Sequence, residues 1–461
     1  MAGARSRPAC PGGCHRGLRP QVVSPFPRGA RFDATGRLTA VGGVEIEHLA
    51  ARCGTPLYVL DHAELVGRMR AYQAAFADRA TVIYAAKALC VAGVLQLAAA
   101  EGLHVDVASG GELHTALRAG LAPERLVLHG NNKSVAELEQ AVQTGVGRVV
   151  IDSFVELERM DAIAARAGRV MDVLVRITPG IETTTHEFVR TGHEDTKFGF
   201  TLSAGLAARA VEQTTQAAHL RLRGLHSHIG SQVLTLDAFA ANARILCNTV
   251  AVLRDALGVE LQELNLGGGL GIRYTDEGSI GPQEYAQALL GVVDERVAEL
   301  GLAMPRLAVE PGRSLVGPAG ITLYRVGTVK DVPGVRRYVS VDGGMSDNLR
   351  PALYGSRYRF ASAGRAATGS TTAPATVVGK HCESGDVLGA DVELPAAIAP
   401  GDLLAVAATG AYNHAMASNY NRLPRPGMVL VRDGELRTLV ERETLEDVIA
   451  RDVRLADDWL G

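Results

Sequence analysis

The chain lacks long apolar runs and an excess of charge of either sign. No stretch approaches the roughly 20 consecutive apolar residues that a membrane-spanning helix needs. Its 47 basic and 50 acidic residues give a formal net charge of −3, so electrostatics offers no reason to expect nucleic acid or a membrane surface as a partner. We therefore expect neither.

Cysteine is scarce and scattered. The spacing does not form the dense framework of a small disulfide-bonded scaffold, which predicts a reducing, cytoplasmic location. Cys10 and Cys14 lie beside His15, but no second ligand pair follows nearby to complete a zinc site, and we expect no metal. The six cysteines are Cys10, Cys14, Cys53, Cys90, Cys247 and Cys382.

Acidic residues are absent from positions 1–31, which contain six arginines and frequent proline and glycine. The region has no apolar run of the length that a secretory signal needs, and no amphipathic pattern of a transit peptide. We predict that residues 1–40 are a disordered basic leader outside the folded domains.

The length of 461 residues predicts two domains, because single cores stop growing near ~250–300 residues. Between residues 61 and 314, short apolar runs alternate with helix-forming stretches, and such runs suit parallel strands buried on both faces. Eight units predict a TIM (β/α)8 barrel, with an open doubly wound sheet as the alternative. The runs are Thr81–Tyr84, Leu103–Val107, Leu126–His129, Arg148–Ile151, Asp172–Ile177, Leu222–His228, Leu261–Leu266 and Arg306–Val309.

The pattern changes after about residue 315, where strand-like runs are separated by turn residues and few helical patterns intervene. This indicates an all-β domain of sandwich or barrel-like form over residues 315–461. Residues 41–60, with the run Pro56–Leu60, precede the barrel and are expected to join this domain. The later runs are Gly320–Val329, Arg337–Val341, Ala375–Val378, Leu403–Ala407 and Met428–Arg432.

Polar residues follow several predicted barrel strands, at the end where TIM barrels carry their chemistry. Lys87 follows the first strand. Partial desolvation there is expected to lower its pKa, and a neutral amine can attack an aldehyde. A solvated loop lysine is the alternative interpretation.

Three glycines, Gly267, Gly268 and Gly269, follow the seventh strand. Without side chains, their backbone N–H groups could converge on an anion, and this strand is a usual phosphate position in the fold. A plain tight turn is the alternative.

Glu310 follows the eighth strand and begins the stretch Glu310-Pro311-Gly312-Arg313. A carboxylate there could pair with a protonated pyridine nitrogen, and the Arg313 guanidinium could hold phosphate or carboxylate. An ion pair between the two residues is the alternative.

His226 and His228 share one face of the sixth strand, since side chains alternate along a strand. The pair could bind zinc, or His228 could pack flat against a cofactor ring, with Ser231 forming a hydrogen bond to phosphate.

In the second domain, Cys382 between His381 and Glu383 is a candidate acid–base group, or simply a packed loop cysteine.

In this order the motifs resemble the fold-type III pyridoxal-phosphate decarboxylases, and closely the diaminopimelate decarboxylase family, over about residues 40–455. The matching stretches are Tyr84–Lys87, Asp106–Glu112, His129–Lys133, Thr185–Phe188, Thr196–Gly199, His226–Gln232, Asn265–Gly269, Glu310–Arg313, Lys380–Asp386 and Gly410–Tyr412.

The resemblance implies pyridoxal 5'-phosphate as the cofactor, with Lys87 holding it covalently, His228 stacked on its ring and Glu310 paired with the ring nitrogen. Cys382 would be a proton donor and, with Lys87, one of two catalytic residues. The implied cofactor-binding residues are Lys87, His228, Ser231, Gly268, Gly269, Glu310, Pro311, Gly312, Arg313 and Tyr412. The implied substrate-binding residues are Arg313, Arg350, Tyr354, Glu383 and Tyr412.

The resemblance further implies decarboxylation of meso-2,6-diaminopimelate to L-lysine and CO2, the last step of lysine biosynthesis. The enzyme would be a homodimer in which each site is completed by the partner's second domain. Arg313 and Arg350 favour a substrate with a second amino-acid head, since a monoamine tail needs no arginine. The alternatives are a decarboxylase of ornithine, lysine or arginine on this fold, and a non-catalytic homologue.

Overall fold

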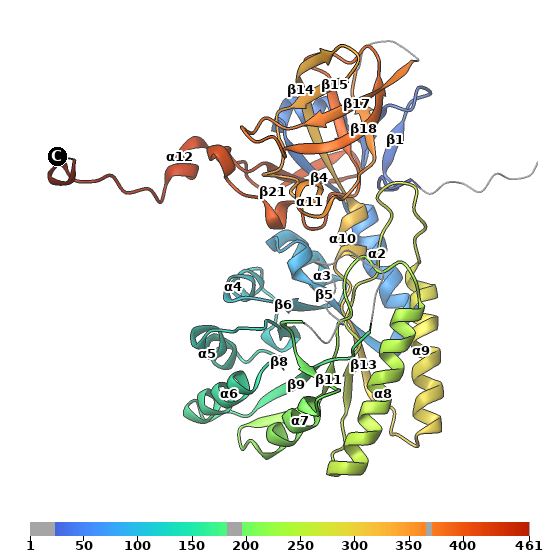
Figure 1. Ribbon diagram of the computed structural model, residues 1–461, viewed down its shortest axis with the longest axis vertical. Helices are drawn as coiled ribbons and strands as arrows, with labels where there is room; N and C mark the ends of the chain where they lie inside the picture. Colours follow the sequence, from blue (N-terminus) through green and yellow to red (C-terminus); the bar gives the residue numbers. More distant parts are fainter. Residues whose placement is uncertain (1–23, 182–195, 366–370, 461) are drawn as a thin grey trace, which may run out of the picture.

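The computed structural model describes residues 24–181, 196–365 and 371–460. It consists of a β/α barrel and a second, curled mixed sheet that lies over one end of the barrel (Figure 1). Among the described residues, no helix has the length and apolar content to cross a membrane.

The barrel is formed by eight parallel strands. β8 pairs with β9 in addition to β7, which closes the sheet into a ring and excludes the open doubly wound alternative. Each of the eight predicted runs overlaps one barrel strand, so the TIM barrel is confirmed. The strands are β5 (Ala80–Ala85), β6 (His104–Val107), β7 (Leu126–Leu128), β8 (Arg148–Ile151), β9 (Met171–Thr178), β11 (Leu220–His226), β12 (Glu263–Asn265) and β13 (Arg306–Val309); the short β10 (Phe200–Thr201) pairs with β9 outside the ring.

Helices surround the barrel and bury their apolar faces against it. Three of them begin at a serine whose side chain accepts the backbone N–H of a glutamate three residues on, namely Ser109, Ser134 and Ser153. The helices are α2 (His62–Phe76), α3 (Ala92–Ala100), α4 (Gly110–Arg118), α5 (Val135–Thr144), α6 (Phe154–Arg166), α7 (Leu206–Gln216), α8 (Asp237–Leu257) and α9 (Pro282–Glu299).

The second domain is built around β14, which leaves the barrel through the short α10 and pairs with strands from both ends of the sequence. β4, from before the barrel, pairs with β14 antiparallel and with β20 parallel, as the Pro56–Leu60 run predicted. The strands are β1 (Ala30–Phe32), β2 (Leu38–Val41), β3 (Val44–Glu45), β4 (Leu57–Asp61), β14 (Gly320–Val332), β15 (Arg336–Val341), β16 (Phe360–Ala363), β17 (Thr372–Val378), β18 (Val387–Pro395), β19 (Leu403–Val406), β20 (Gly427–Arg432) and β21 (Glu435–Val440), and the short helices are α1 (Ile46–Cys53), α10 (Arg313–Val316), α11 (Arg350–Tyr354) and α12 (Leu445–Ile449).

The prediction of a disordered leader over residues 1–40 does not hold for residues 24–40. β1 and β2 belong to the second sheet, and Phe26 is buried in its core beside Leu38. These apolar residues bury enough surface to order the segment, although its composition is rich in proline, glycine and arginine. Residues 1–23 lie outside the described residues.

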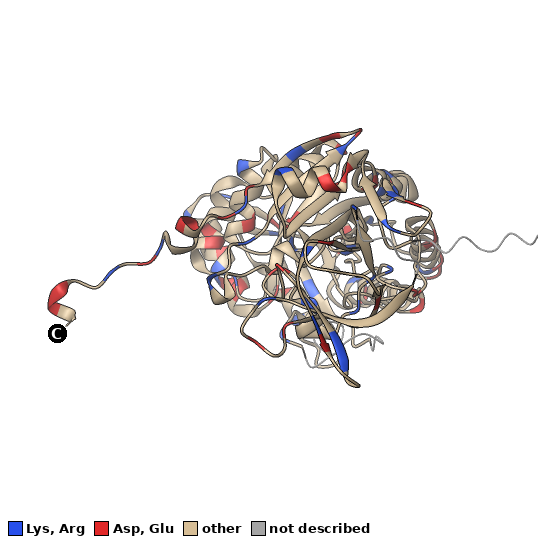
Figure 2. Ribbon diagram, turned by 90° about the horizontal axis from the view of Figure 1, so that it is seen from above, with Lys and Arg blue, Asp and Glu red and all other residues tan. Residues whose placement is uncertain are grey.

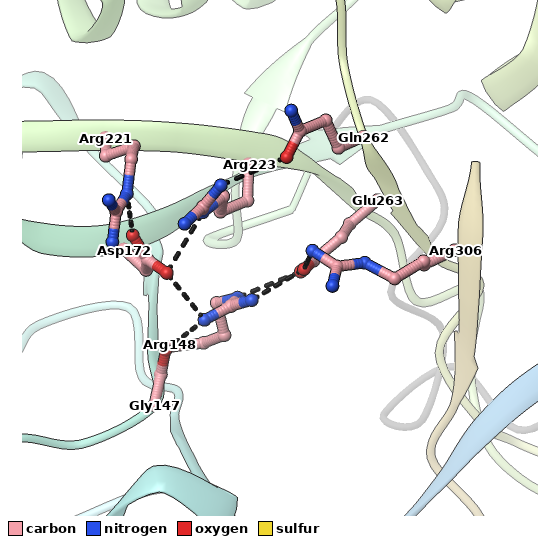
Figure 3. Close-up of polar contacts among 8 residues, drawn as sticks. All are labelled: Gly147, Arg148, Asp172, Arg221, Arg223, Gln262, Glu263 and Arg306. Atoms are coloured by element: carbon pink, nitrogen blue, oxygen red, sulfur yellow. Dashed lines mark hydrogen bonds and ion pairs between the residues drawn. The ribbon is translucent and has the colours of Figure 1, made fainter. Parts of the chain in front are cut away.

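Opposite charges meet at the N-terminal ends of the barrel strands, the end away from the polar residues described below (Figure 3). Arg148, the first residue of β8, reaches across to Glu263 of β12 through Nε (2.9 Å) and Nη2 (2.6 Å). Its Nη1 lies 2.9 Å from Asp172 of β9. Arg306 of β13 also reaches Glu263, at 2.7 Å, so the cluster joins strands that are not neighbours in the ring.

Arg148 is therefore predicted to stabilise the barrel more than Arg306 does. The Arg148 side chain is 23% exposed and that of Arg306 is 67% exposed, so solvent screens the second pair far more. We expect Arg148→Met to lower the free energy of unfolding by about 1–3 kcal/mol, and the matched control Arg306→Met by less than about 1 kcal/mol. Urea unfolding of the two variants tests this, and equal losses would contradict it.

Candidate active site

The second domain is attached directly to the turn that carries Lys87. This residue lies in a 3-10 turn, Ala86–Ala88, immediately after β5. The backbone N–H of Tyr412, from the second domain, donates to the Ala88 carbonyl over 2.9 Å. Ala85 on the other side of the turn donates to the Pro311 carbonyl over 3.1 Å. The turn is thus held from two directions, with Lys87 at the barrel mouth.

The expected lowering of the Lys87 pKa is wrong in direction. Desolvation does act to lower it, but Tyr412, Asp106 and Glu310 raise it by more, so the net pKa of Lys87 lies above its ordinary value. The side chain keeps accessible surface in the mouth. Without a bound partner, this lysine is an ammonium group facing buried acids.

Glu310 receives three side-chain contacts from three other strand ends. His129 Nε2 lies 2.9 Å from Oε1, His226 Nε2 lies 3.0 Å from Oε2, and Asn265 Nδ2 donates to Oε1 over 2.7 Å. Burial acts to raise the pKa of Glu310, but the two imidazoles outweigh it and hold the pKa well below its ordinary range. The site therefore presents a fixed carboxylate.

His226 is held as a neutral imidazole by its surroundings. Burial lowers its pKa to about 4, against the opposing effect of Glu310. Its Nδ1 is buried without a hydrogen-bond partner among the described residues, so a proton there would be an unsatisfied buried donor. The ligand atoms of His129, His226 and Glu310 lie within 4.8 Å of one another, close enough for a metal ion, but hydrogen bonds already join all three.

The zinc pair proposed for His226 and His228 is not formed, because the two rings point to different partners. His226 faces Glu310, whereas His228 Nδ1 accepts the backbone N–H of Gly268 over 3.3 Å. Burial is the largest of the effects that hold the pKa of His228 well below its ordinary value. A neutral, oriented imidazole at this position suits stacking against a flat ring.

The glycine turn after β12 packs closely against its surroundings, and two of its three N–H groups have partners within the protein. Gly267 N–H donates to Asn265 Oδ1 and Gly268 N–H to His228 Nδ1, so neither is directed at a ligand. A Cβ on Gly268 would lie 2.0 Å from the Glu310 carbonyl oxygen. Only glycine lets this turn approach the Glu310 strand.

Two buried arginines contact Tyr274, a residue that the sequence motifs did not indicate. Arg313 Nη1 donates to the Tyr274 hydroxyl over 2.5 Å, and its Nη2 donates to Ser231 over 2.8 Å. The Arg313 guanidinium also lies over the Tyr412 ring, and that of Arg350 lies 4.6 Å from the centre of the Tyr274 ring. Arg313 therefore contacts both Ser231 and Tyr412.

Tyr358 is a second residue absent from the sequence prediction. Its hydroxyl accepts from Arg350 Nη1 over 2.5 Å. Tyr354, which was predicted, is half-buried at the end of α11.

Gly312 lies close to the Lys87 turn. A Cβ on Gly312 would lie 2.9 Å from the Cβ of Ala85, so the small size of glycine allows this packing. The motif Thr185–Phe188 lies outside the described residues.

Cys382 and Glu383 are exposed on the second domain. Their loop is held by a 2.8 Å contact between His381 Nδ1 and Asp386, and Cys382 N–H donates to Asn421 Oδ1 over 2.9 Å. Both contacts are within the second domain. The loop is thus ordered by contacts from its own domain.

The residues of the mouth fit pyridoxal phosphate on their own chemistry. A primary amine is accessible at Lys87, a carboxylate is fixed at Glu310, and a neutral flat ring lies at His228. Arg313 has a buried Nε without a hydrogen-bond partner among the described residues, which suits a nearby anionic group.

Comparison with known proteins supports this assignment. A family model described as "Pyridoxal-dependent decarboxylase, pyridoxal binding domain" matches residues 62–317, so fold and site define a pyridoxal-phosphate-dependent decarboxylase. The chain is 47% identical over 449 residues to the diaminopimelate decarboxylase of Mycobacterium tuberculosis (strain ATCC 25618 / H37Rv), covering 95% of this chain and 99% of that protein. This chain belongs to the diaminopimelate decarboxylase family.

Other relatives agree. The diaminopimelate decarboxylase of Bacillus subtilis (strain 168) is 46% identical over 417 residues, which cover 90% of this chain and 94% of that protein. The structure of diaminopimelate decarboxylase from M. jannaschii in complex with L-lysine has a TM-score of 0.87 at 32% identity, covering 93% of this chain and 98% of that one. The enzyme is a carboxy-lyase whose cofactor is pyridoxal 5'-phosphate.

The low pKa of His226 predicts acid sensitivity of the fold. The unfolded chain binds a proton at His226 near its ordinary pKa of 6.5, whereas the folded chain does so only near pH 4. Stability should therefore fall as pH drops from about 6.5 to 4, by up to about 3 kcal/mol from this group. We expect His226→Gln to flatten the pH dependence of the free energy of unfolding. The exposed His48→Gln is the control, and equal slopes in both variants would contradict the assignment.

Proposed function

We propose that this chain decarboxylates meso-2,6-diaminopimelate to L-lysine and CO2, the last step of lysine biosynthesis, as a cytoplasmic homodimer with shared active sites. The choice of substrate rests on two arginines, Arg313 and Arg350. Both are buried, and neither forms an ion pair with a carboxylate in the described part of the chain. Buried cations without anionic partners suit an anionic ligand, and a diamino diacid supplies a second carboxylate.

Each residue of the mouth has a place in this reaction. Pyridoxal phosphate, when bound, supplies a cationic ring that accepts the electron pair left as CO2 departs. Lys87 offers the amine that holds the cofactor and yields its place to the substrate amine. Glu310, fixed by His129 and His226, keeps a negative charge where the ring nitrogen would lie. The low pKa imposed on Glu310 means that it stays ionised at neutral pH.

The phosphate and substrate ends are assigned to two overlapping sets of residues, which share Arg313 and Tyr412. Ser231, Gly268, Gly269 and Tyr412 would surround the phosphate, beside Arg313. Arg350, Tyr354, Glu383 and Tyr412 would hold the far end of the substrate, together with Arg313.

The proton that replaces the departing carboxylate is assigned to Cys382 of the partner subunit. The basis is placement, since Cys382 and Glu383 are ordered but exposed on their own chain. A second subunit over the mouth would also exclude water from the site. The four cysteines in the described ranges are free thiols, which agrees with a cytoplasmic location.

Two of the rival substrates, lysine and ornithine, are named for a protein of the same fold. A lysine/ornithine decarboxylase from Vibrio vulnificus complexed with putrescine has a TM-score of 0.70 at 23% identity, which indicates a shared fold alone. The non-catalytic alternative is disfavoured because Lys87, Glu310 and Cys382 are all present.

The substrate assignment is tested by turnover and by covalent labelling. Purified enzyme with pyridoxal phosphate should release lysine from meso-diaminopimelate faster than it turns over ornithine, lysine or arginine. Borohydride treatment should attach the cofactor to the peptide that contains Lys87, and Lys87→Arg should abolish the label. Faster turnover of ornithine, lysine or arginine than of meso-diaminopimelate would make the chain a decarboxylase of that amino acid instead. Label on another lysine would refute the role of Lys87.

The shared site is tested by mixing two inactive variants, Lys87→Ala and Cys382→Ala, under conditions of subunit exchange. If Cys382 acts across the dimer, a mixed dimer has one site with both lesions and one intact site. Random exchange should then restore activity to about a quarter of native. Lys87→Ala mixed with Glu310→Gln is the control and should restore nothing, since both lesions lie in the barrel. No recovery in the first mixture, with exchange verified by mass, would show that Cys382 serves its own chain.

A further inference from the structure

Residues 441–460, which we call the terminal segment, leave the body of the subunit after β21. Both views show the segment extending away from the two domains (Figures 1 and 2). It contains α12, and every residue from Ile449 to Leu460 is exposed. Nothing in the described part of the same chain covers this stretch.

The terminal segment is rich in large apolar side chains that face water. Six of the sixteen exposed large hydrophobic residues of the described chain lie in it, each 48–91% exposed. Apolar surface gathered in this way is typical of an interaction site. The six are Leu445, Ile449, Val453, Leu455, Trp459 and Leu460.

The base of the terminal segment is fixed by ionic contacts to the stretch 419–425. Asn419 Nδ2 donates to Glu443 over 2.6 Å, and Arg425 pairs with the same carboxylate. Farther along, Arg422 pairs with Asp452 at 2.8 Å. The segment therefore leaves the body in a defined direction.

The same stretch also holds the loop that presents Cys382. Asn421 Oδ1 accepts the Cys382 N–H, and the ring of Tyr420 stacks on His381 with 5.5 Å between centroids and 6° between planes. The terminal segment and the Cys382 loop are thus both held by residues 419–425. A partner that meets the loop is brought close to the terminal segment.

We propose that the apolar side chains of residues 445–460 pack on the partner subunit, beside the barrel mouth that receives Cys382. This inference rests on the shared-site homodimer proposed above. It assigns the terminal segment to the dimer interface, with Trp459 as the largest apolar contact. Tryptophan is enriched among the residues that dominate binding energy at such interfaces.

The charge of the segment disfavours other occupants. Residues 445–460 contain five acidic residues and two arginines, and acidic residues colour the ribbon near its far end (Figure 2). Amphipathic segments that bind anionic membranes, and surfaces that bind nucleic acid, carry an excess of Lys and Arg instead. A second copy of this chain does not require a basic face.

Trp459 provides a direct test, because it is the one tryptophan of the chain. In the pyridoxal-loaded enzyme at concentrations where sedimentation shows a dimer, we expect blue-shifted emission and weak quenching by acrylamide. On dilution, the emission should shift to the red and quenching should increase in parallel with dissociation. A proven dimer with solvent-exposed Trp459 emission would overturn the proposal while leaving the catalytic assignment intact.

Dimer affinity is the second measurement. We expect the double variant Trp459→Ala/Leu460→Ala to raise the dimer dissociation constant at least about tenfold. Trp459→Phe, which keeps an aromatic contact, should have a smaller effect. The control is Val170→Ala/Met304→Ala, which removes two apolar side chains that are 53% and 50% exposed and lie just before β9 and β13, and it should leave the constant unchanged.

The outcomes separate the two proposals. Equal dissociation constants in the terminal-segment variant and the control would overturn the packing of this segment, even if mixed Lys87 and Cys382 variants complement. Trp459 that remains shielded in the diluted monomer would also overturn it, because the segment would then fold on its own chain. A monomer with full turnover would refute the shared site, and with it the interface on which the segment packs.

Discussion

The carboxylate of Glu310 is the group on which the rest of the mouth depends. A buried negative charge is costly unless it is fully hydrogen-bonded, and Glu310 meets that condition through His129, His226 and Asn265. These three side chains lie at the ends of β11 and β12 and just after β7, and only a closed barrel brings the ends of those strands around β13. The requirement for that charge therefore constrains half of the ring.

The two ends of the barrel carry charged groups with different roles, stabilising the fold at one end and binding ligands at the other. At the N-terminal ends of the strands, Arg148 bridges Glu263 and Asp172, and opposite charges neutralise one another (Figure 3). At the mouth, the buried Arg313 and Arg350, which both contact Tyr274, form no ion pair with a carboxylate in the described part of the chain. Charges satisfied at one end stabilise the fold, and charges left over at the other are available to an anionic cofactor and substrate.

The second domain connects this mouth to the proposed partner. Tyr412 joins it to the Lys87 turn by a backbone hydrogen bond, and the buried core of the barrel continues into it through Leu60, Ala411 and Met428. The Cys382 loop and the terminal segment project from the same domain. On this view the domain fixes the position of Lys87 in one subunit and supplies the proton donor to the other.

The sequence by itself determined the barrel, because the apolar strand runs and their spacing are local properties that do not depend on distant residues. Two of the predicted runs match β8 and β13 at both ends. It also indicated Lys87 and Glu310, which come just after β5 and β13, and Arg313 in the stretch that follows Glu310. Only the tertiary structure decided what surrounds them. The contacts of Tyr274 with Arg313 and Arg350, the bond between Gly268 N–H and His228, and the raised pKa of Lys87 depend on partners tens or hundreds of residues away. The order of residues 24–40 was decided in the same way, because the segment gains its stability from a sheet whose other strands lie far along the chain.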